Sequence, residues 1–219
     1  MTGAEKIKIK VCGMRDSENI TQVTSLVPDY MGFIFYSPSP RYVGADFKLL
    51  DKMATPIKRV GVFVNAGNDE ILEQSRIVDF DHVQLHGNEG VEQAAALRDS
   101  GFKVIKVFSV DDDFDFIRTK QFVRAVDFFL FDTKGKLHGG NARAFDWKVL
   151  NRYDQEVPFF LSGGISPENV NDITSLKGMN LYALDVNSGV EQAPGLKDLK
   201  KLKTIFDAVD KIRLNRITK

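Results

Sequence analysis

The sequence has a single cysteine, no excess of either charge and no long apolar run. Cys12 cannot form an intramolecular disulfide, which is typical of a reducing compartment. Thirty Lys and Arg residues balance thirty Asp and Glu residues, so the broad basic surface of a nucleic-acid-binding protein is not expected. No apolar stretch approaches the ~20 residues that span a bilayer, and the first residues do not resemble a signal peptide. We therefore expect a soluble, cytoplasmic protein that binds neither membrane nor nucleic acid.

Nothing in the sequence marks a boundary between domains. The 219 residues contain no linker rich in Ser, Pro and Gly and no low-complexity tract. Hydrophobic residues make up 43% and charged residues 27%, which is ordinary for a globular chain and unlike a disordered one. We therefore predict a single domain over residues 1–219.

Strand-like and helix-like segments alternate along the chain. The last helix candidate has apolar residues at three- and four-residue spacing from Leu196 to Ile212. Strands buried on both faces favour parallel pairing, so the alternation indicates either an open doubly wound sheet or a closed barrel. The eight strand candidates are Ile7–Gly13, Met31–Tyr36, Arg59–Val64, His82–Gly87, Val104–Val110, Phe128–Thr133, Phe159–Gly164 and Leu181–Val186.

The closed barrel is the better prediction of the two. Eight strand–helix repeats suit the length of a small barrel. An open dinucleotide-binding sheet would usually carry a glycine-rich turn after its first strand, whereas Gly13 is followed by Met, Arg, Asp, Ser, Glu and Asn. We predict the α/β class and a single (β/α)8 TIM barrel.

Reactive side chains lie where the predicted strands end, which is where barrel enzymes build their active sites. Cys12, His86, Asp132 and Asp185 close four strands, and Arg41 follows the second strand. Side chains alternate between the two faces of a strand. This alternation directs the thiol of Cys12 and the carboxyl of Asp132 into the same barrel mouth.

The loops after the last two strands predict a phosphate site. Gly163 and Gly164 precede Ser166 and Pro167, which predict a helix start with Ser166 as its N-cap. Backbone N–H groups at such a position can bind a phosphate, and barrels often bind phosphate between these loops. The neighbouring loop adds Asn187, Ser188 and Gly189.

Each of these features also has a purely structural explanation. A single cysteine is often a small buried hydrophobe, and an isolated aspartate often caps a helix or pairs with a nearby lysine, here Lys134. His86 can be a hydrogen-bonded structural histidine, Arg41 a solvated loop charge, and the paired glycines a tight turn. Their coincidence at one barrel mouth favours a functional site, because burying the Asp132 carboxylate unpaired would be costly.

Ordered motifs at these strand ends carry a family resemblance over nearly the whole chain. They are KVCGM, GFIFYSPSPRYV, RVGVFVN, VQLHGNE, FDTK with the following GG and FDW, LSGGISPENV and ALDVNSGVEQAPGLKD. Together they resemble the phosphoribosylanthranilate isomerase family, whose members are barrel enzymes of tryptophan biosynthesis.

The resemblance implies a reaction and a role for each candidate residue. The reaction is an Amadori rearrangement of N-(5-phosphoribosyl)anthranilate to 1-(2-carboxyphenylamino)-1-deoxyribulose 5-phosphate, without cofactor or metal. Asp132 would be the general acid that opens the sugar ring, and Cys12 the general base that removes a proton from the adjacent carbon. Arg41 would pair with the anthranilate carboxylate, and His86 and Asp185 would line the pocket. The phosphate would be bound by backbone N–H groups of Gly164, Ser188 and Gly189.

The resemblance leaves several points as expectations. The partner would be a small phosphorylated molecule, and the chain a monomer or a homodimer. At neutral pH the acid and base need protonation states opposite to their ordinary ones. We expect Lys10, on the same strand face as Cys12, to favour the thiolate, and burial to favour the uncharged acid of Asp132.

The chain departs from the family at two places. Asn141, Ala142 and Arg143 stand where relatives usually carry Gly-Thr-Gly or Gly-Ser-Gly, so Arg143 could add a contact to an anionic substrate. Asn187 replaces the commoner Ser of the last phosphate loop, which matters less if the contact is made through backbone.

Two other interpretations stay open. Another phosphosugar barrel enzyme could be a relative of indole-glycerol-phosphate synthase, with a catalytic lysine, or of the histidine-pathway isomerase, with an aspartate in place of Cys12. Cys12 argues against both. A flavin-binding or non-catalytic ligand-binding barrel could use the same phosphate site.

Overall fold

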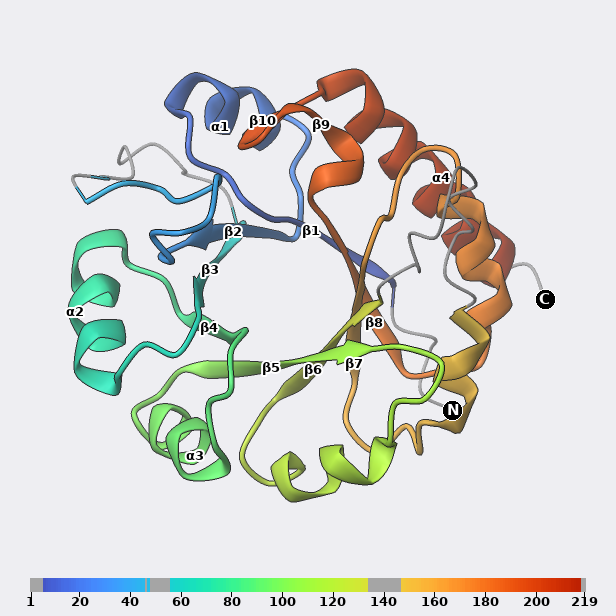
Figure 1. Ribbon diagram of the computed structural model, residues 1–219. Coiled ribbons are helices and arrows are strands. Elements are labelled where there is room, and N and C mark those ends of the chain that lie inside the picture. Colours follow the sequence, from blue (N-terminus) through green and yellow to red (C-terminus); the bar gives the residue numbers. More distant parts are fainter. Residues whose placement is uncertain (1–5, 46, 48–55, 134–146, 218–219) are drawn as a thin grey trace.

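Eight parallel strands form a closed barrel in the computed structural model, which describes residues 6–45, 47, 56–133 and 147–217. The strands pair in chain order, and β1 pairs with β8 to close the ring, as Figure 1 shows along the barrel axis. The predicted TIM barrel is therefore confirmed. The strands are β1 (Lys8–Val11), β2 (Tyr30–Ile34), β3 (Lys58–Phe63), β4 (His82–Leu85), β5 (Lys103–Val110), β6 (Phe128–Thr133), β7 (Phe159–Ser162) and β8 (Leu181–Val186).

Each predicted strand matches an observed one, but several predicted strands run too far. Cys12 and His86 lie just after β1 and β4, and Gly163 follows β7. Cys12 and His86 therefore stand on the first residues of the loops, whereas Asp132 and Asp185 lie in the last residues of β6 and β8, all at the C-terminal mouth of the barrel.

The connections between strands mix α-helices with 3₁₀ helices. Asp16 starts the first helix, because its side chain accepts a hydrogen bond from the backbone N–H of Asn19 at 2.8 Å. The α-helices are α1 (Ser17–Thr24), α2 (Asn68–Val78), α3 (Val91–Asp99) and α4 (Leu199–Ile217). The 3₁₀ helices are η1 (Phe116–Phe122), η2 (Trp147–Arg152), η3 (Val170–Leu176) and η4 (Ser188–Val190).

The predicted start of the last helix at Leu196 was wrong. Leu196 lies in β10 (Leu196–Lys197), which pairs with β9 (Glu191–Ala193) in an antiparallel ribbon. Asp198 then caps α4, since its carboxylate accepts hydrogen bonds from the backbone N–H groups of Lys200 and Lys201. From Leu202 to Ile212 the predicted apolar stripe is buried against the barrel.

Ser166 does not cap a helix, contrary to the prediction. The side chain of Asn169 accepts a hydrogen bond from the N–H of Ser166 at 2.9 Å and donates one to the carbonyl of Gly164 at 2.9 Å. These bonds hold a turn, and helical structure begins only at Val170, in η3.

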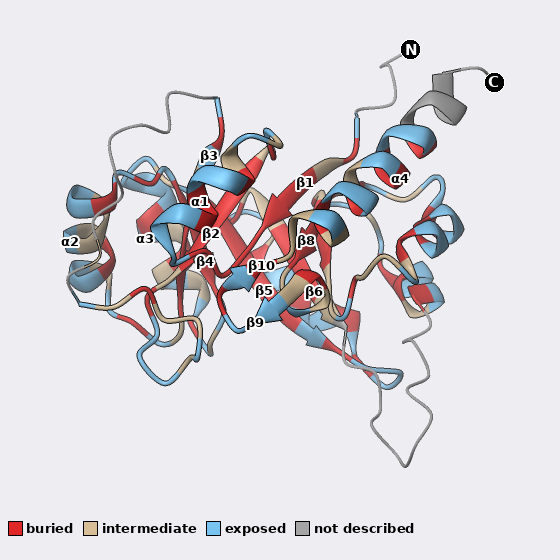
Figure 2. Cartoon of the chain, turned by 90° about the horizontal axis from the view of Figure 1, so that it is seen from above, coloured by how far each residue is buried: buried red, intermediate tan, exposed pale blue. Residues whose placement is uncertain are grey.

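Alternation along the strands divides the core into two layers. Figure 2 shows the buried strands and the partly exposed helices around them. The outer layer, between strands and helices, contains Ile9, Val11, Phe129 and Phe131. The inner layer, inside the barrel, contains Cys12 and Leu130, so Asp132 also faces inward. The predicted faces of β1 and β6 are confirmed.

Aromatic rings fill the inner layer. Tyr30 and Phe160 are fully buried, with ring centroids 5.4 Å apart, and the ring centroids of Phe128 and Tyr182 lie 4.5 Å apart. Burying each such side chain contributes roughly 1.5–3 kcal/mol. This packing gives the mouth a rigid floor.

The described residues include no helix that is long and apolar enough to cross a membrane. That the whole of residues 1–219 forms one domain stays a prediction, because the described residues have gaps.

Candidate active site

A cavity of about 190 Å³ opens at the C-terminal mouth of the barrel. Nine of the ten predicted site residues line it, and the exception is Arg41. The same cavity thus contains the candidate acid, the candidate base and both glycine-bearing loops. Its predicted lining residues are Cys12, His86, Asp132, Gly163, Gly164, Asp185, Asn187, Ser188 and Gly189, and its further lining residues are Ile34, Val62, Gln84, Ser162 and Ile165.

Cys12 lies beside a buried ion pair. The Nζ of Lys10 is 2.9 Å from Oδ1 of Asp185, and both side chains are almost completely buried. Burial would lower the pKa of Lys10, but the charge of Asp185 and its hydrogen bond outweigh burial and raise this pKa. Lys10 is therefore a firmly charged ammonium next to the thiol.

The protonation of Cys12 differs in part from the expectation. Burial raises the pKa of the thiol and Asp185 raises it further, whereas Lys10 lowers it. Lys10 thus favours the thiolate as expected, but burial outweighs it, because Lys10 is already paired with Asp185. Without substrate, Cys12 is a neutral thiol at neutral pH.

Gly32 in β2 makes room for this cluster. A Cβ atom at this position would lie 2.8 Å from Sγ of Cys12 and 3.1 Å from Nζ of Lys10. Both polar atoms therefore approach the bare backbone of Gly32. A glycine inside a buried strand is the sequence signal for such a close approach.

His86 links Asp132 to a buried amide. Its Nε2 is 3.8 Å from Oδ2 of Asp132, and its Nδ1 is 3.0 Å from Nε2 of Gln84. In this orientation the amide nitrogen of Gln84 faces Nδ1 of His86, and Nε2 of His86 faces Asp132. Gln84 is 1% exposed, and its Oε1 has no hydrogen-bond partner among the described residues.

The two loops predicted to bind phosphate touch each other. Gly163 and Gly164 have φ values of 103° and 67°, which favour glycine. A Cβ on Gly189 would lie only 2.1 Å from the carbonyl oxygen of Ile165, so the loop after β8 approaches the loop after β7 as only glycine allows. This contact sets the spacing of the backbone N–H groups on the two loops.

Arg41 lies at the rim of the cavity and is bound to a carboxylate of the protein. Its Nε is 2.9 Å and 3.1 Å from the two carboxylate oxygens of Glu191, and its Nη2 is 2.6 Å from Oε2. A Cβ on Gly13 would lie 2.8 Å from both Cδ of Arg41 and Oδ1 of Asn187. The side chain of Arg41 therefore lies beside Gly13 and close to Asn187, which lines the cavity.

Glu191 also binds the buried Lys197. The Nζ of Lys197 is 2.6 Å from Oε1 of Glu191 and 2.7 Å from Oδ1 of Asn187. Although burial alone would raise it, the bonds from Arg41 and Lys197 lower the pKa of Glu191 to about 2. The carboxylate is therefore ionised and connects Arg41 with the loop after β8.

Sequence reasoning missed Gly32, Gln84, Glu191 and Lys197. The departures Asn141, Ala142 and Arg143 lie outside the described residues, as does Lys134. In the part of the chain that the structure describes, no group of three or more His, Cys, Asp or Glu side chains could hold a metal ion.

Comparison with known proteins gives one consistent result. The family model described as N-(5'-phosphoribosyl)anthranilate isomerase matches residues 9–208. N-(5'-phosphoribosyl)anthranilate isomerase of Parabacteroides distasonis is 41% identical over 204 residues, which cover 92% of each chain. The enzyme of the same name from Phocaeicola vulgatus is 40% identical, covering 91% of this chain and 96% of the relative.

Solved structures agree with the sequence comparison. Phosphoribosyl anthranilate isomerase from Thermotoga maritima superimposes with a TM-score of 0.79 at 31% identity, covering 94% of this chain and 99% of that one. A complex of such an isomerase with reduced 1-(o-carboxyphenylamino)-1-deoxyribulose 5-phosphate gives a TM-score of 0.77 at 30% identity, with the same coverage.

Proposed function

The chain belongs to the phosphoribosylanthranilate isomerase family of tryptophan biosynthesis, and we propose that Asp132 is its general acid and Cys12 its general base. The substrate would be N-(5-phosphoribosyl)anthranilate and the product 1-(2-carboxyphenylamino)-1-deoxyribulose 5-phosphate. The observation that carries the assignment is the single cavity in which a carboxyl, a thiol and two glycine-bearing loops meet. Family membership also favours this reaction over the other phosphosugar barrels and over a ligand-binding barrel.

The first step needs a proton donor beside the furanose ring. Asp132 projects inward from β6, and its side chain is 23% exposed, so it is accessible from the cavity. Protonation of the ring oxygen by Asp132 breaks the bond between that oxygen and the first sugar carbon. The anthranilate nitrogen then holds the positive charge as an iminium.

The second step removes a proton from the second sugar carbon. The Cys12 thiolate would take this proton, and the electron pair of the C–H bond then forms the enolamine, which tautomerises to the ketone. The thiol must first pass its proton to solvent, because burial raises its pKa and keeps it protonated. The cationic iminium favours the thiolate once the ring has opened, since an opposite charge nearby stabilises the ionised form.

The two ends of the substrate would be bound by opposite sides of the mouth. The phosphate would accept hydrogen bonds from backbone N–H groups of Gly164, Ser188 and Gly189, with Gly163 and Asn187 shaping the loops. Arg41 would bind the anthranilate carboxylate. Glu191 occupies the Nε–Nη2 edge of its guanidinium, so the Nη1–Nη2 edge can pair with a second carboxylate.

The remaining candidates would act around the reacting atoms. Asp185 holds Lys10 in place beside Cys12. His86 directs its Nε2 toward Asp132. Both also line the wall of the cavity.

The experiment that tests the assignment generates phosphoribosylanthranilate in situ and follows the loss of its fluorescence. The wild-type protein should consume it, and Cys12→Ser and Asp132→Asn should each lower kcat by roughly 10²–10⁴-fold. Asp99→Asn, an exposed carboxyl at the end of α3, is the matched control and should keep full activity. No decay with the wild type would refute the reaction, and full activity in both site variants would refute the roles of the acid and the base.

A further inference from the structure

Among the described residues, Glu191 is the one carboxylate that contacts both Arg41 and Lys197. We propose that Glu191 is a positioning residue, which fixes the guanidinium of Arg41 so that its free edge faces the substrate carboxylate. This inference rests on the proposed function, because it assigns Arg41 a carboxylate to bind.

The geometry of the pair leaves Arg41 little freedom. Three N–O distances of 2.6–3.1 Å join the Nε–Nη2 edge of Arg41 to both carboxylate oxygens. Such a fork-to-carboxylate contact fixes the plane of the guanidinium as well as its position. The side chain of Glu191 is 5% exposed and that of Arg41 20%, so the carboxylate is shielded from solvent while part of Arg41 stays accessible.

Glu191 is itself fixed by neighbours that differ between its two oxygens. Oε1 accepts hydrogen bonds from Nζ of Lys197 at 2.6 Å and from the N–H of Gly195 at 3.0 Å, as well as from Nε of Arg41 at 2.9 Å. Oε2 accepts only from Arg41 among the described residues. Oε1 therefore binds both the β9–β10 ribbon and Nε of Arg41, whereas Oε2 binds Arg41 alone in the described part of the chain.

The charges at this end of the cavity also require Glu191. Arg41 and Lys197 carry two positive charges, and Glu191 neutralises one of them. Without Glu191, two cations would share a half-buried site, and a guanidinium without a fixed partner would adopt several orientations.

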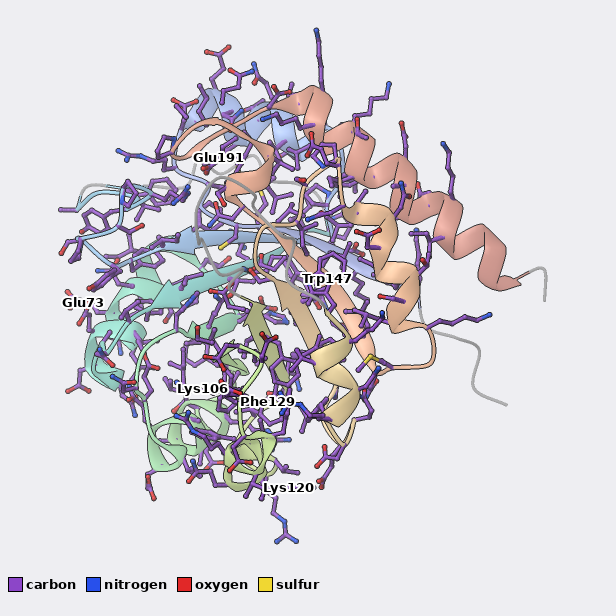
Figure 3. The ribbon with its side chains drawn as sticks, turned by 45° about the vertical axis from the view of Figure 1, so that its right-hand side comes forward. Glu73, Lys106, Lys120, Phe129, Trp147 and Glu191 are labelled. Carbon is purple, nitrogen blue, oxygen red and sulfur yellow. The ribbon has the colours of Figure 1, made fainter. Side chains whose placement is uncertain are left out.

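The difference between the oxygens makes Glu191→Gln a selective variant. The glutamine carbonyl can keep the bonds from Lys197 and Gly195, while its NH₂ group replaces Oε2 and faces the N–H groups of Arg41. The bonds from Arg41 to Oε2 are then lost, and a single bond from Nε to the carbonyl oxygen remains, so the two-point contact that fixes the guanidinium is lost while the ribbon is kept. Glu73→Gln makes the same change on an exposed glutamate of α2, on a different side of the molecule (Figure 3), and serves as the control.

The effect should fall on binding more than on chemistry, because Arg41 would hold a group remote from the reacting carbons. We expect Glu191→Gln to raise KM by roughly 10-fold or more, which corresponds to the free energy of one hydrogen bond to a charged group. The kcat should stay within about threefold of the wild-type value. The Kd of the reduced carboxyphenylamino-deoxyribulose phosphate should rise by a similar factor. Inhibition by inorganic phosphate should stay within about twofold, since the phosphate loops are not altered.

A double-mutant cycle separates positioning from a general structural role. In an Arg41→Met background, Glu191→Gln should change KM less than about twofold, because the residue through which it acts is gone. An equally large effect in both backgrounds, an equal loss of affinity for inorganic phosphate, or no effect at all would overturn the proposal. Glu191→Asp keeps the negative charge on a shorter side chain, so it should recover part of the substrate affinity that Glu191→Gln loses.

The same experiment keeps the two proposals distinguishable. A wild-type protein that binds the reduced product analogue but turns over no phosphoribosylanthranilate would refute the proposed function. The dependence of analogue binding on Glu191 would then still test the positioning role.

Discussion

Replacing Gly189 by alanine should separate the two loops that we propose to bind the phosphate. The added Cβ would lie 2.1 Å from the carbonyl oxygen of Ile165 and 2.9 Å from its carbonyl carbon. Ordinary contacts begin at 3.4 Å, so the loops must move apart by about 1.3 Å. The obstacle is backbone on both sides, and no flexible side chain can turn away to relieve it.

A displacement of this size should weaken phosphate binding and destabilise the protein. Losing one hydrogen bond to a charged group costs about 1.5–3 kcal/mol, which raises KM roughly 10- to 100-fold. Overpacking should lower the free energy of unfolding by about 1–3 kcal/mol, and Tm by roughly 2–12 °C for a chain of this size.

Steady-state kinetics and thermal unfolding of Gly189→Ala measure both quantities. Gly67→Ala is the control, because a Cβ at Gly67 meets nothing within 4 Å and φ is −74° there. If Gly189→Ala keeps KM within twofold and Tm within 1 °C of the wild type, the contact does not set the spacing of the loops and the reasoning is wrong.

Three further predictions concern the charged groups around the cavity. Lys10→Met should shift alkylation of Cys12 by iodoacetamide to higher pH, because Lys10 lowers the pKa of the thiol, and an unchanged pH profile would contradict this. Gly32→Ala should lower kcat by roughly 10–100-fold, because the added Cβ would displace Sγ of Cys12 and Nζ of Lys10. It should lower Tm far less than Gly189→Ala, since side-chain ends can move more easily than backbone, and equal losses of Tm in the two variants would contradict this reasoning. The pKa of Glu191 is lowered to about 2 in the folded protein. Its ionised carboxylate therefore contributes at most about 3 kcal/mol to the free energy of unfolding above pH 4.5, and this contribution is lost as the pH falls toward 2. Urea unfolding at pH 7, 4 and 3 should therefore show the gap in stability between wild type and Glu191→Gln narrowing with acidity, and a constant gap would disprove the assignment.

Local periodicity was sufficient to predict the barrel and the inward direction of its reactive side chains. The faces of Cys12 and Asp132 follow from the two-residue repeat of a strand, which depends on neighbours in the sequence alone. Where local side-chain bonds compete with helix formation, prediction failed. Asn169 holds a turn in place of the helix expected at Ser166, and Leu196 joins a ribbon before Asp198 caps α4.

The charge network was beyond prediction because its members are far apart in the sequence. Arg41 and Glu191 are separated by 150 positions, and a long side chain can reach many partners from one backbone position. The protonation of Cys12 was also only half predicted. The direction in which the pKa of Cys12 shifts depends on the balance between burial, Lys10 and Asp185, which only the packed structure defines.

The pairing of β1 with β8 has a consequence for when activity can arise. Lys10 and Asp185 are 175 positions apart, yet each is the other's charged partner inside the barrel. On a ribosome, the first strand emerges long before the last, so the buried ammonium has no counter-charge until nearly the whole chain has been made. The active site is thus a product of barrel closure: a chain released before β8 would be left with both an open sheet edge and an unpaired interior charge, and it should be degraded rather than persist as a partly active enzyme.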